Sequence, residues 1–557
     1  MTARSRPAPR RAFTLVEMLV AMVLTLILVA AIAEFYAYVG ETVKDGRAMI
    51  EMSGSLRTAV QRLRTDLDLL TLPVAPWTDD GGGVLVPRVV VNNITIFPDT
   101  VTPIGSGAGG YFEIFEGPAS DCDVNANNII DLSDLTADID GDGMPDWNEP
   151  NVTSLLGDGD DFIAMTIRAS GQPLTGRYGT YPNATATVAA YSIVLAQHAE
   201  VIWWVGFDDL NANGVWNLEE PRQIYRRQLL IRPDAGLNGL LGPPPREYQN
   251  FADAQRVLKE FWQTDDISAS IRLESNAMGN PVYRLRPNSL ADLSRRERRF
   301  AHTAFAANGT DNFPYPQALL PSYSAASPGV STFGPKPSYV QQGAGRGEDI
   351  VLTNLLAMDV QVYDQGALLR ADTSQATLAT DAISGLSPSD PGYVTAIQQG
   401  FPVVGTGAYV DLGYVTKLEG LLGVAQGFYY NNPTRFNTAF GNSLFGAAPN
   451  YYLAQGSSYP GLGLVYDTWS LSYERDGLNQ DWLADNGNMS NINQAPFDEG
   501  TNGLDDDGIN GVDDVGERET QPPFSRPLRG IQITIRVYEP GTRQMRQATV
   551  KADFINE

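Results

Sequence analysis

Acidic and amide side chains recur in this 557-residue chain at the spacing of an oxygen-ligated calcium loop. Calcium takes six to eight hard oxygen ligands, and a twelve-residue loop supplies them from positions 1, 3, 5, 7, 9 and 12, with glycine at position 6. The segment 138–149, DIDGDGMPDWNE, matches every one of these positions. Its predicted ligands are Asp138, Asp140, Asp142, the carbonyl of Met144, Asp146 and Glu149.

A second segment of this kind lies directly upstream, at 123–134, with Asn128 in the place of the glycine. Asn tolerates the left-handed backbone conformation that this place requires. The predicted ligands are Asp123, Asn125, Asn127, the carbonyl of Ile129, Asp131 and Asp134. The two adjacent segments resemble the tandem calcium loops of dockerin modules, and these residues alone carry the resemblance.

Two further segments repeat the spacing, and the second is degraded because Gly508 takes the place of the second ligand. The predicted ligands at 209–220 are Asp209, Asn211, Asn213, the carbonyl of Val215, Asn217 and Glu220. The predicted ligands at 506–517 are Asp506, Asn510, the carbonyl of Val512, Asp514 and Glu517. The alternative for each segment is a solvated acidic turn, because Asp-Gly and Asn-Gly pairs are good turn formers in their own right.

The charge and the cysteine content favour a structural role for calcium and argue against nucleic acid as a partner. The formal net charge is −26, from 39 Lys and Arg against 65 Asp and Glu. Such a surface repels the phosphate backbone of nucleic acids. Because Cys122 is the only cysteine, no intrachain disulfide can form, and calcium would take over the task of holding the acidic loops.

The element that must carry the rest of the chain is an apolar segment at 13–33, FTLVEMLVAMVLTLILVAAIA. About 20 apolar residues suffice to span a bilayer as a helix. The arginines that precede the segment are Arg4, Arg6, Arg10 and Arg11. Because basic flanks stay on the cytoplasmic side, they predict a cytoplasmic amino terminus and an exported remainder.

Glu17 is unusual in a membrane anchor, since an acidic side chain near mid-membrane costs roughly 2.5–3.5 kcal/mol. A basic leader that ends in a small residue and continues as FTLVE and an apolar helix resembles the amino terminus of type IV pilins and type II secretion pseudopilins. The resemblance implies that a prepilin peptidase cleaves between Ala12 and Phe13 and methylates Phe13. It also implies that Glu17 pairs with the terminal amine of a neighbouring subunit. Ala12 departs from the family, which usually has glycine there.

Three simpler interpretations of the same segment remain open. It would serve as a plain signal anchor, as a twin-arginine signal through RRAF, or as a cleaved secretory signal with its cleavage site in AAIAEF. A secretory signal has no use for a carboxylate inside its apolar core, so Glu17 favours the pilin-type interpretation.

The period of the apolar residues predicts the elements that follow. From Met49 to Leu70 they recur at spacings of three and four, so the helix should continue past the membrane and pack one stripe on the folded domain. Gly40 and Gly46 are candidate points of bending, and Pro73 ends the helix. The period then changes to two, with strands at 191–207 and 222–233 pairing as a hairpin, a strand at 348–364, and a terminal hairpin within 527–554.

These elements predict an α+β fold of the pilin type, in which a long amino-terminal helix packs on an antiparallel sheet with large loop-rich insertions and calcium loops. The predicted units are a basic leader at 1–12, the helix at 13–72, a β-rich region with calcium loops at 73–235, a partly helical insertion at 236–345, a core strand at 346–364, a loop-rich insertion at 365–475, an acidic segment at 476–520 and the terminal hairpin at 521–557.

Single residues in these units carry further expectations. Trp203 and Trp204 should face opposite sides of one strand, because side chains alternate along a strand. A helix is expected near 252–262 and another near 289–302. The second contains four arginines that we expect on an exposed face, with docking of an acidic neighbour as the alternative, and His302 should lie at the surface.

The function implied by the resemblance is structural. No nucleophile motif, phosphate loop or Cys-His metal set occurs in the sequence, so no enzymatic activity is expected. Strand sequences such as AEVIWWV resemble the J-type minor pseudopilin or its W-type pilus counterpart, whose partners are other subunits, the prepilin peptidase and the membrane. The expected location is the inner membrane, with one span and an exported domain. The alternative is a displayed calcium-dependent adhesin that uses a pilin-type signal.

Overall fold

The structure of the protein is a computed structural model that describes most of the predicted elements. The residues it describes are 14–71, 89–91, 94–96, 110–115, 161–180, 190–207, 222–235, 247–294, 298–300, 302, 347–371, 385–390, 392–415, 418, 422, 433–443, 445–446, 465–468, 528–539, 542 and 544–554.

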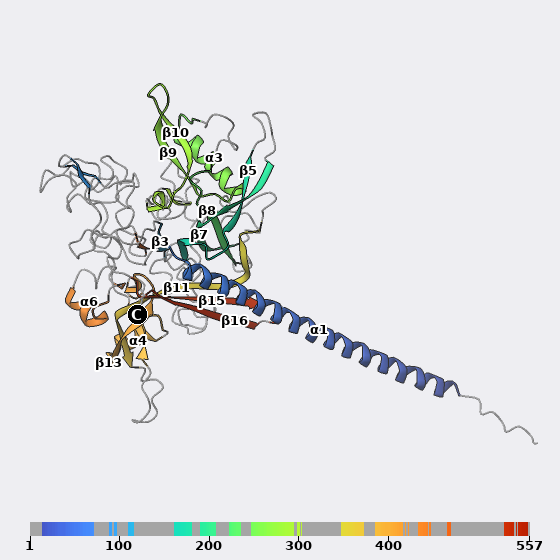
Figure 1. The fold of residues 1–557 in the computed structure, drawn as a ribbon. Helices are drawn as coiled ribbons and strands as arrows, with labels where there is room; N and C mark the ends of the chain where they lie inside the picture. The colour runs from blue at the N-terminus through green and yellow to red at the C-terminus, as the bar shows by residue number, and fades with distance from the viewer. Residues whose placement is uncertain are drawn as a thin grey trace, which may run out of the picture.

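The chain begins with one continuous helix, α1 (Leu15–Asp68), which has 54 residues. At 1.5 Å per residue it is roughly 80 Å long. Its first part extends away from the folded body, and its last part lies along β15 and β16 (Figure 1). The helix passes through Gly40 and Gly46 without interruption, so neither glycine acts as a break. The extension of the helix beyond the apolar segment is confirmed.

Ten strands in the described part of the chain form one sheet, and every pairing in it is antiparallel. The main path of the sheet runs through β14 (Val465–Asp467), β3 (Phe112–Phe115), β4 (Phe162–Arg168), β7 (His198–Phe207), β8 (Arg222–Leu230), β11 (Ile350–Ala371), β15 (Gly530–Glu539) and β16 (Gln544–Asp553). The strands β12 (Gly385–Leu386) and β13 (Val403–Val410) pair with β11 as well.

Two predicted hairpins lie in this sheet. In the β7–β8 pair Trp203 is opposite Arg226, and in the β15–β16 pair Ile533 is opposite Val550. Between them runs β11, whose 22 residues pair first with β8 and β15 and then with β13 and β12. The long strand therefore joins the two hairpins into one sheet. Both hairpins are confirmed, except that the predicted strand at 191–207 divides into β6 (Ala190–Ala196), which pairs with β5 (Leu174–Thr180), and β7.

Both faces of the central strands are buried, and a different helix covers each face. In β4, Ile163 and Met165 face the core under α1, whereas Phe162 and Ala164 face the core on the opposite side. The helix contributes a stripe of buried side chains: Met52, Leu56, Ala59, Leu63 and Leu67. Burying one large apolar side chain contributes about 1.5–3 kcal/mol, so this stripe fixes the end of α1 on the sheet.

Trp203 and Trp204 confirm the predicted alternation along β7. Trp203 lies in the core under α1, while Trp204 lies in the opposite core and stacks on Tyr225 with 5.2 Å between the ring centroids. The opposite core is covered by α3 (Phe251–Thr264), the helix expected near 252–262. Asn250 begins this helix by accepting a hydrogen bond from the main-chain nitrogen of Asp253 at 2.8 Å.

Small two-stranded units and short helices complete the fold. They are β1 (Val89–Val91) with β2 (Ile94–Ile96), β5 (Leu174–Thr180) with β6 (Ala190–Ala196), β9 (Ala269–Ser275) with β10 (Pro281–Pro287), the helices α4 (Tyr393–Gln398) and α6 (Pro433–Phe440), and a 3-10 turn at Asp292–Ser294. The segment expected to be mostly loop thus contains α4, α6 and a full strand, β13. The Gly-rich sequence gives no local strand signal, because β13 is held in the sheet by its pairing with β11.

The fold is therefore α+β, with a long amino-terminal helix packed on a large antiparallel sheet, as predicted. The calcium loops that completed the predicted fold all lie outside the described residues.

Candidate functional site

The first turn of α1 is closed by a reciprocal capping arrangement between Thr14 and Glu17. The main-chain nitrogen and the hydroxyl of Thr14 donate to Glu17 Oε2 at 2.8 and 3.0 Å, and the Glu17 nitrogen donates to Thr14 Oγ1 at 3.3 Å. A capping box satisfies main-chain donors that have no partner inside the helix. Glu17 remains exposed, so its carboxylate is accessible to another molecule. Ala12 and Phe13 lie outside the described residues.

Behind this turn the helix is apolar on every side and touches no other part of the described structure. Every large apolar side chain from Leu15 to Ile32 is exposed, and Leu15 reaches 81%. The helix is long and apolar enough to cross a membrane. Such an extended apolar surface is not stable in water and has to be covered by lipid or by another protein.

The other end of α1 is fixed by a buried ion pair. Arg226 on β8 donates from Nε to Asp66 Oδ2 at 2.7 Å and from one terminal nitrogen to Oδ1 at 2.8 Å. The indole nitrogen of Trp203 donates to the same Oδ2 at 2.8 Å. All three residues are buried, and the Asp66 carboxylate thus accepts a fork of donors from two strands.

The chain that leaves the helix adds to the sheet at once. The nitrogen of Arg168 donates to the carbonyl of Leu69 at 2.8 Å, and the nitrogen of Thr71 donates to the carbonyl of Thr166 at 3.0 Å. One end of α1 is therefore held by the apolar stripe, by Asp66 and by this short pairing, while the other end is not buried by any of the described residues. The arrangement presents an apolar, carboxylate-bearing helix end at a distance from the folded domain.

A second buried polar cluster lies on the far side of the sheet and corrects two sequence expectations. Arg299 is fully buried, and one of its terminal nitrogens lies 2.9 Å from Glu113 Oε2 and 2.7 Å from Asp467 Oδ2. His302 is also buried, with Nε2 at 3.1 Å from Glu113 Oε2. The described residues of the expected helix at 289–302 contain no α-helix, and they include a 3-10 turn at Asp292–Ser294. The expectation that the described arginines and His302 lie on an exposed surface was wrong.

Glu200 completes this cluster. Its carboxylate accepts hydrogen bonds from the hydroxyl of Tyr111 at 2.8 Å, from the hydroxyl of Ser268 at 2.6 Å and from the nitrogen of Phe300 at 2.8 Å. Burial raises the pKa of Glu200 despite these donors. Because Glu200 is sealed from solvent and its donors come from three parts of the chain, the cluster ties the loops to the sheet.

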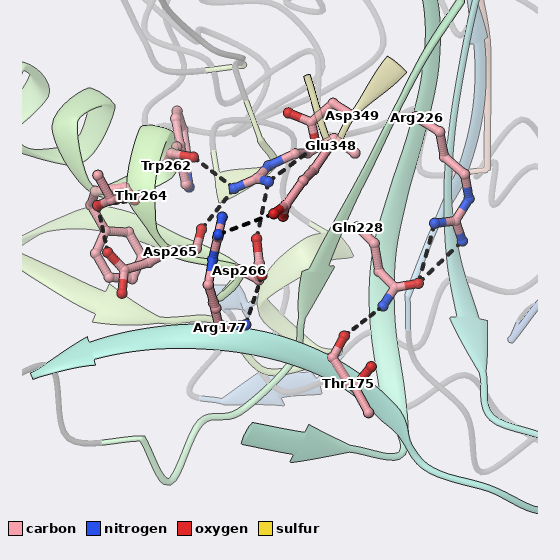
Figure 2. Close-up of polar contacts among 12 residues, drawn as sticks. Thr175, Arg177, Arg226, Gln228, Trp262, Thr264, Asp265, Asp266, Glu348 and Asp349 are labelled. Carbon is pink, nitrogen blue, oxygen red and sulfur yellow. Dashed lines mark hydrogen bonds and ion pairs between the residues drawn. The ribbon is translucent and has the colours of Figure 1, made fainter. Parts of the chain in front are cut away.

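The carboxyl end of α3 is joined to the sheet by a third network, drawn in Figure 2. Arg227 on β8 donates to the carbonyls of Trp262 and Asp265 at 2.7 and 2.8 Å and lies 3.0 Å from Asp266 Oδ1 and 3.2 Å from Asp349 Oδ1. One buried guanidinium therefore holds α3, the start of β11 and β8 together.

Asp265 in this network predicts a measurable pH dependence of stability. Burial raises the pKa of Asp265 to about 6, although the nitrogen of Gly179 and the hydroxyl of Thr264 donate to its carboxylate. The folded state therefore keeps a proton that the unfolded state loses near 3.8, the ordinary pKa of an aspartate. The free energy of unfolding should fall as pH rises from about 4 to about 6, by up to about 3 kcal/mol.

Urea unfolding of the wild-type chain and of Asp265→Asn at several pH values measures this effect. The wild type should lose stability relative to the variant as pH rises, with no further change above about pH 7. Asp234→Asn is the control. The stability of the wild type relative to this variant should change with pH in the opposite direction, because the hydrogen bond from Arg232 lowers the pKa of Asp234 at the surface. A difference between wild type and Asp265→Asn that is equal at pH 4 and pH 7 contradicts the prediction.

All predicted calcium ligands lie outside the described residues. Within the described residues, no group of three or more His, Cys, Asp or Glu side chains is arranged to hold a metal ion. The predicted binding of calcium therefore stays a prediction.

Comparison with known proteins bears on the helix. Residues 8–33 match the family model described as the prokaryotic N-terminal methylation motif. The match contains Ala12, Phe13 and Glu17, and it covers the end of the leader and the start of α1. Neither the curated proteins nor the solved structures contain a match to the chain. The chain thus carries a pilin-type amino-terminal signal of the kind that a prepilin peptidase processes, and the apolar helix behind it fits membrane anchoring.

Proposed function

We propose that the chain is a minor pseudopilin of the J-type or W-type class, a non-enzymatic subunit of a type II secretion pseudopilus or a type IV pilus-like filament. The observation that carries the proposal is the match of residues 8–33 to the methylation motif at the free, apolar end of α1. A helix that is held at one end and exposed along the other supports transfer from lipid into a bundle of subunits.

In this mechanism the protein first spans the inner membrane with its leader in the cytoplasm. The prepilin peptidase removes residues 1–12 and methylates Phe13. Glu17 then pairs with the amine of a neighbouring subunit, which offsets the cost of a carboxylate in the membrane, roughly 2.5–3.5 kcal/mol. Most of the chain follows α1, and so bulky a domain suits a rare subunit near the tip of the filament better than a repeated subunit of the shaft.

Substitution of Glu17 tests the mechanism. Glu17→Leu should insert into the membrane and lose its leader normally, because an apolar residue inserts at least as well as a carboxylate. Its incorporation into sheared filaments should fall to background, since no carboxylate remains to pair with the neighbouring amine. The measurement is the amount of the full-length chain in the filament fraction relative to the membrane fraction.

Glu34→Leu is the matched control, because Glu34 is an exposed carboxylate on the same helix beyond the motif match. It should enter filaments as the wild type does. Equal incorporation of Glu17→Leu and the wild type would show that Glu17 has no role in assembly.

Structural calcium is the second part of the proposal, supported by the ligand spacing in the sequence. Calcium sites outside the cytoplasm often have dissociation constants of about 10⁻⁴–10⁻³ M. At a free calcium concentration of 100 times the dissociation constant, one site stabilises the folded state by about 2.7 kcal/mol. Calcium should therefore raise the melting temperature of the full chain, and a chelator should lower it.

The best-matched loop provides the variant for this test. Replacing Asp138, Asp140 and Asp142 together by Asn removes the charge from three predicted ligands while keeping their size. The variant should bind one calcium ion fewer than the wild type by titration calorimetry, and magnesium should not replace calcium. Identical melting temperatures in calcium and in chelator would exclude structural calcium.

A further inference from the structure

A cavity of about 610 Å³ lies beside the anchored end of α1. One wall is the flank of the helix at residues 57–69, and the other is formed by β4, β5 and β8. The apolar part of its lining comes from Leu69, Ile167 and Leu174. The cavity is open to solvent at the helix flank, where Arg57 and Arg62 are exposed.

Three arginines line this cavity on a chain whose net charge is −26: Arg57, Arg62 and Arg226. Arg226 is already paired with Asp66, the one carboxylate among the lining residues. Within the described part of the chain, Arg57 and Arg62 have no ion-pair partner. Desolvation and the positive charge of Arg226 lower the pKa of Arg62, although the Asp66 carboxylate, which is paired with Arg226, acts in the opposite direction.

The neighbouring polar groups are oriented by their own contacts. Both terminal nitrogens of Arg226 donate to Gln228 Oε1 at 3.2 Å, and Gln228 Nε2 donates to the carbonyl of Thr175 at 3.1 Å (Figure 2). Gln61 adds an amide on the same helix flank as the two arginines, whereas the hydroxyl of Thr58 on that flank donates to the carbonyl of Gly54 at 2.9 Å. The strand side of the cavity is thus fixed, and the helix side offers donors that are available to a ligand.

The shape of the lining identifies the chemistry of the ligand. An apolar floor with guanidinium groups at its mouth suits a carboxylate carried on an aliphatic stem, because the stem covers the floor while the carboxylate meets the planar donors of the arginines. A glutamate or aspartate side chain of a polypeptide has this form.

The position of the cavity decides between a lipid and a protein as the source of this anion. Arg57 follows Ile32, near the end of the apolar segment, by 25 helical residues, which corresponds to roughly 38 Å along the helix axis. The headgroup region extends only about 5–8 Å beyond the hydrocarbon core. Lipid phosphates therefore lie out of reach, while a neighbouring subunit packed along α1 would lie beside the cavity.

We propose that this cavity receives an acidic side chain from a different subunit of the filament, so that Arg57 and Arg62 fix the lateral position of this chain among its neighbours. The inference rests on the proposed function, since it needs a neighbour that lies along α1. Glu17 would act at the membrane end of the contact and the two arginines at the end next to the folded domain.

Site-specific crosslinking of the full chain in filament-producing cells tests the inference. A photoreactive benzophenone amino acid replaces Gln61, which is exposed on the cavity flank. The expected adduct joins this chain to another subunit, and mass spectrometry should map it to a segment that contains Asp or Glu. Arg62→Glu should lower the yield of the adduct about tenfold, because it replaces attraction by repulsion.

Arg64→Glu is the matched control, since Arg64 is exposed on the same helix and does not line the cavity. It makes the same change of charge and should leave the yield unchanged, and Arg62→Gln should give an intermediate yield. Equal loss in Arg62→Glu and Arg64→Glu, an adduct with lipid, an adduct between two copies of this chain, or no adduct would each overturn the inference.

Amino-terminal sequencing of the protein in the same preparation distinguishes failure of the cavity inference from failure of the proposed function. If the chain begins at methylated Phe13 but the adduct does not depend on Arg62, only the cavity inference fails. If the leader is retained, the proposed function fails and the cavity inference fails with it.

Discussion

Arg299→Met is expected to destabilise the folded domain by about 3–5 kcal/mol, the usual cost of removing one partner from a buried ion pair. Arg299 lies between Glu113 and Asp467, and its guanidinium is 4.1 Å from the centre of the Tyr111 ring. Burial alone would lower the pKa of Arg299, but the two carboxylates raise it above its ordinary value. The substitution leaves the buried carboxylates of Glu113 and Asp467 without the guanidinium that both contact.

Urea unfolding of the full-length chain measures this loss, with Arg256→Met as the control. Arg256 forms an ion pair with Glu260 on the exposed face of α3, at 2.8 Å, and its removal should cost less than about 1 kcal/mol. Combining Arg299→Met with Glu113→Gln and Asp467→Asn should recover part of the loss, because the unpaired charges are removed together. Equal destabilisation by Arg299→Met and Arg256→Met would contradict this description of the cluster.

Asp66→Ala should be nearly as damaging, and its effect should be concentrated at the helix. The substitution leaves Arg226 buried without its carboxylate and the indole nitrogen of Trp203 without its acceptor, which together cost about 3–5 kcal/mol. Because Asp66 joins α1 to β7 and β8, the helix end should separate from the sheet before the sheet unfolds.

Limited proteolysis measures the separation, since an undocked helix is cleaved within residues 52–68 while the sheet stays protected. Asp68→Ala is the matched control, because Asp68 is exposed two residues away and should leave both stability and cleavage unchanged. If Asp66→Ala is cleaved at the wild-type rate, the ion pair does not hold the helix and the apolar stripe alone does.

The elements that the sequence predicted well are those whose signal is local. A few neighbouring residues are enough to indicate one buried face. The helix shows this in the spacing of Met52, Leu56 and Leu63, and the terminal hairpin shows it in the alternation of Ile531, Ile533 and Ile535. The same alternation places Trp203 and Trp204 in different cores. The amino-terminal motif is also local, because the apolar run and Glu17 are contiguous in the chain.

The parts that the sequence did not predict depend on partners that are distant in the chain. Arg299 meets Glu113 and Asp467 across separations of 186 and 168 residues, so an arginine-rich segment resembled a solvated surface. Asp66 carries a local signal, namely a carboxylate inside the apolar stripe between Leu63 and Leu67. Such a residue can be buried only if a cation meets it, and that cation is Arg226.

Intact mass and amino-terminal sequence of the protein from membranes, with and without a prepilin peptidase, test the central claim most directly. We expect a chain that begins at N-methylated Phe13 only when the peptidase is present. A leader that persists in both preparations would make α1 a plain signal anchor for a displayed domain. A chain that begins near Glu34 would make the protein a secreted one, and either result would contradict assembly through Glu17.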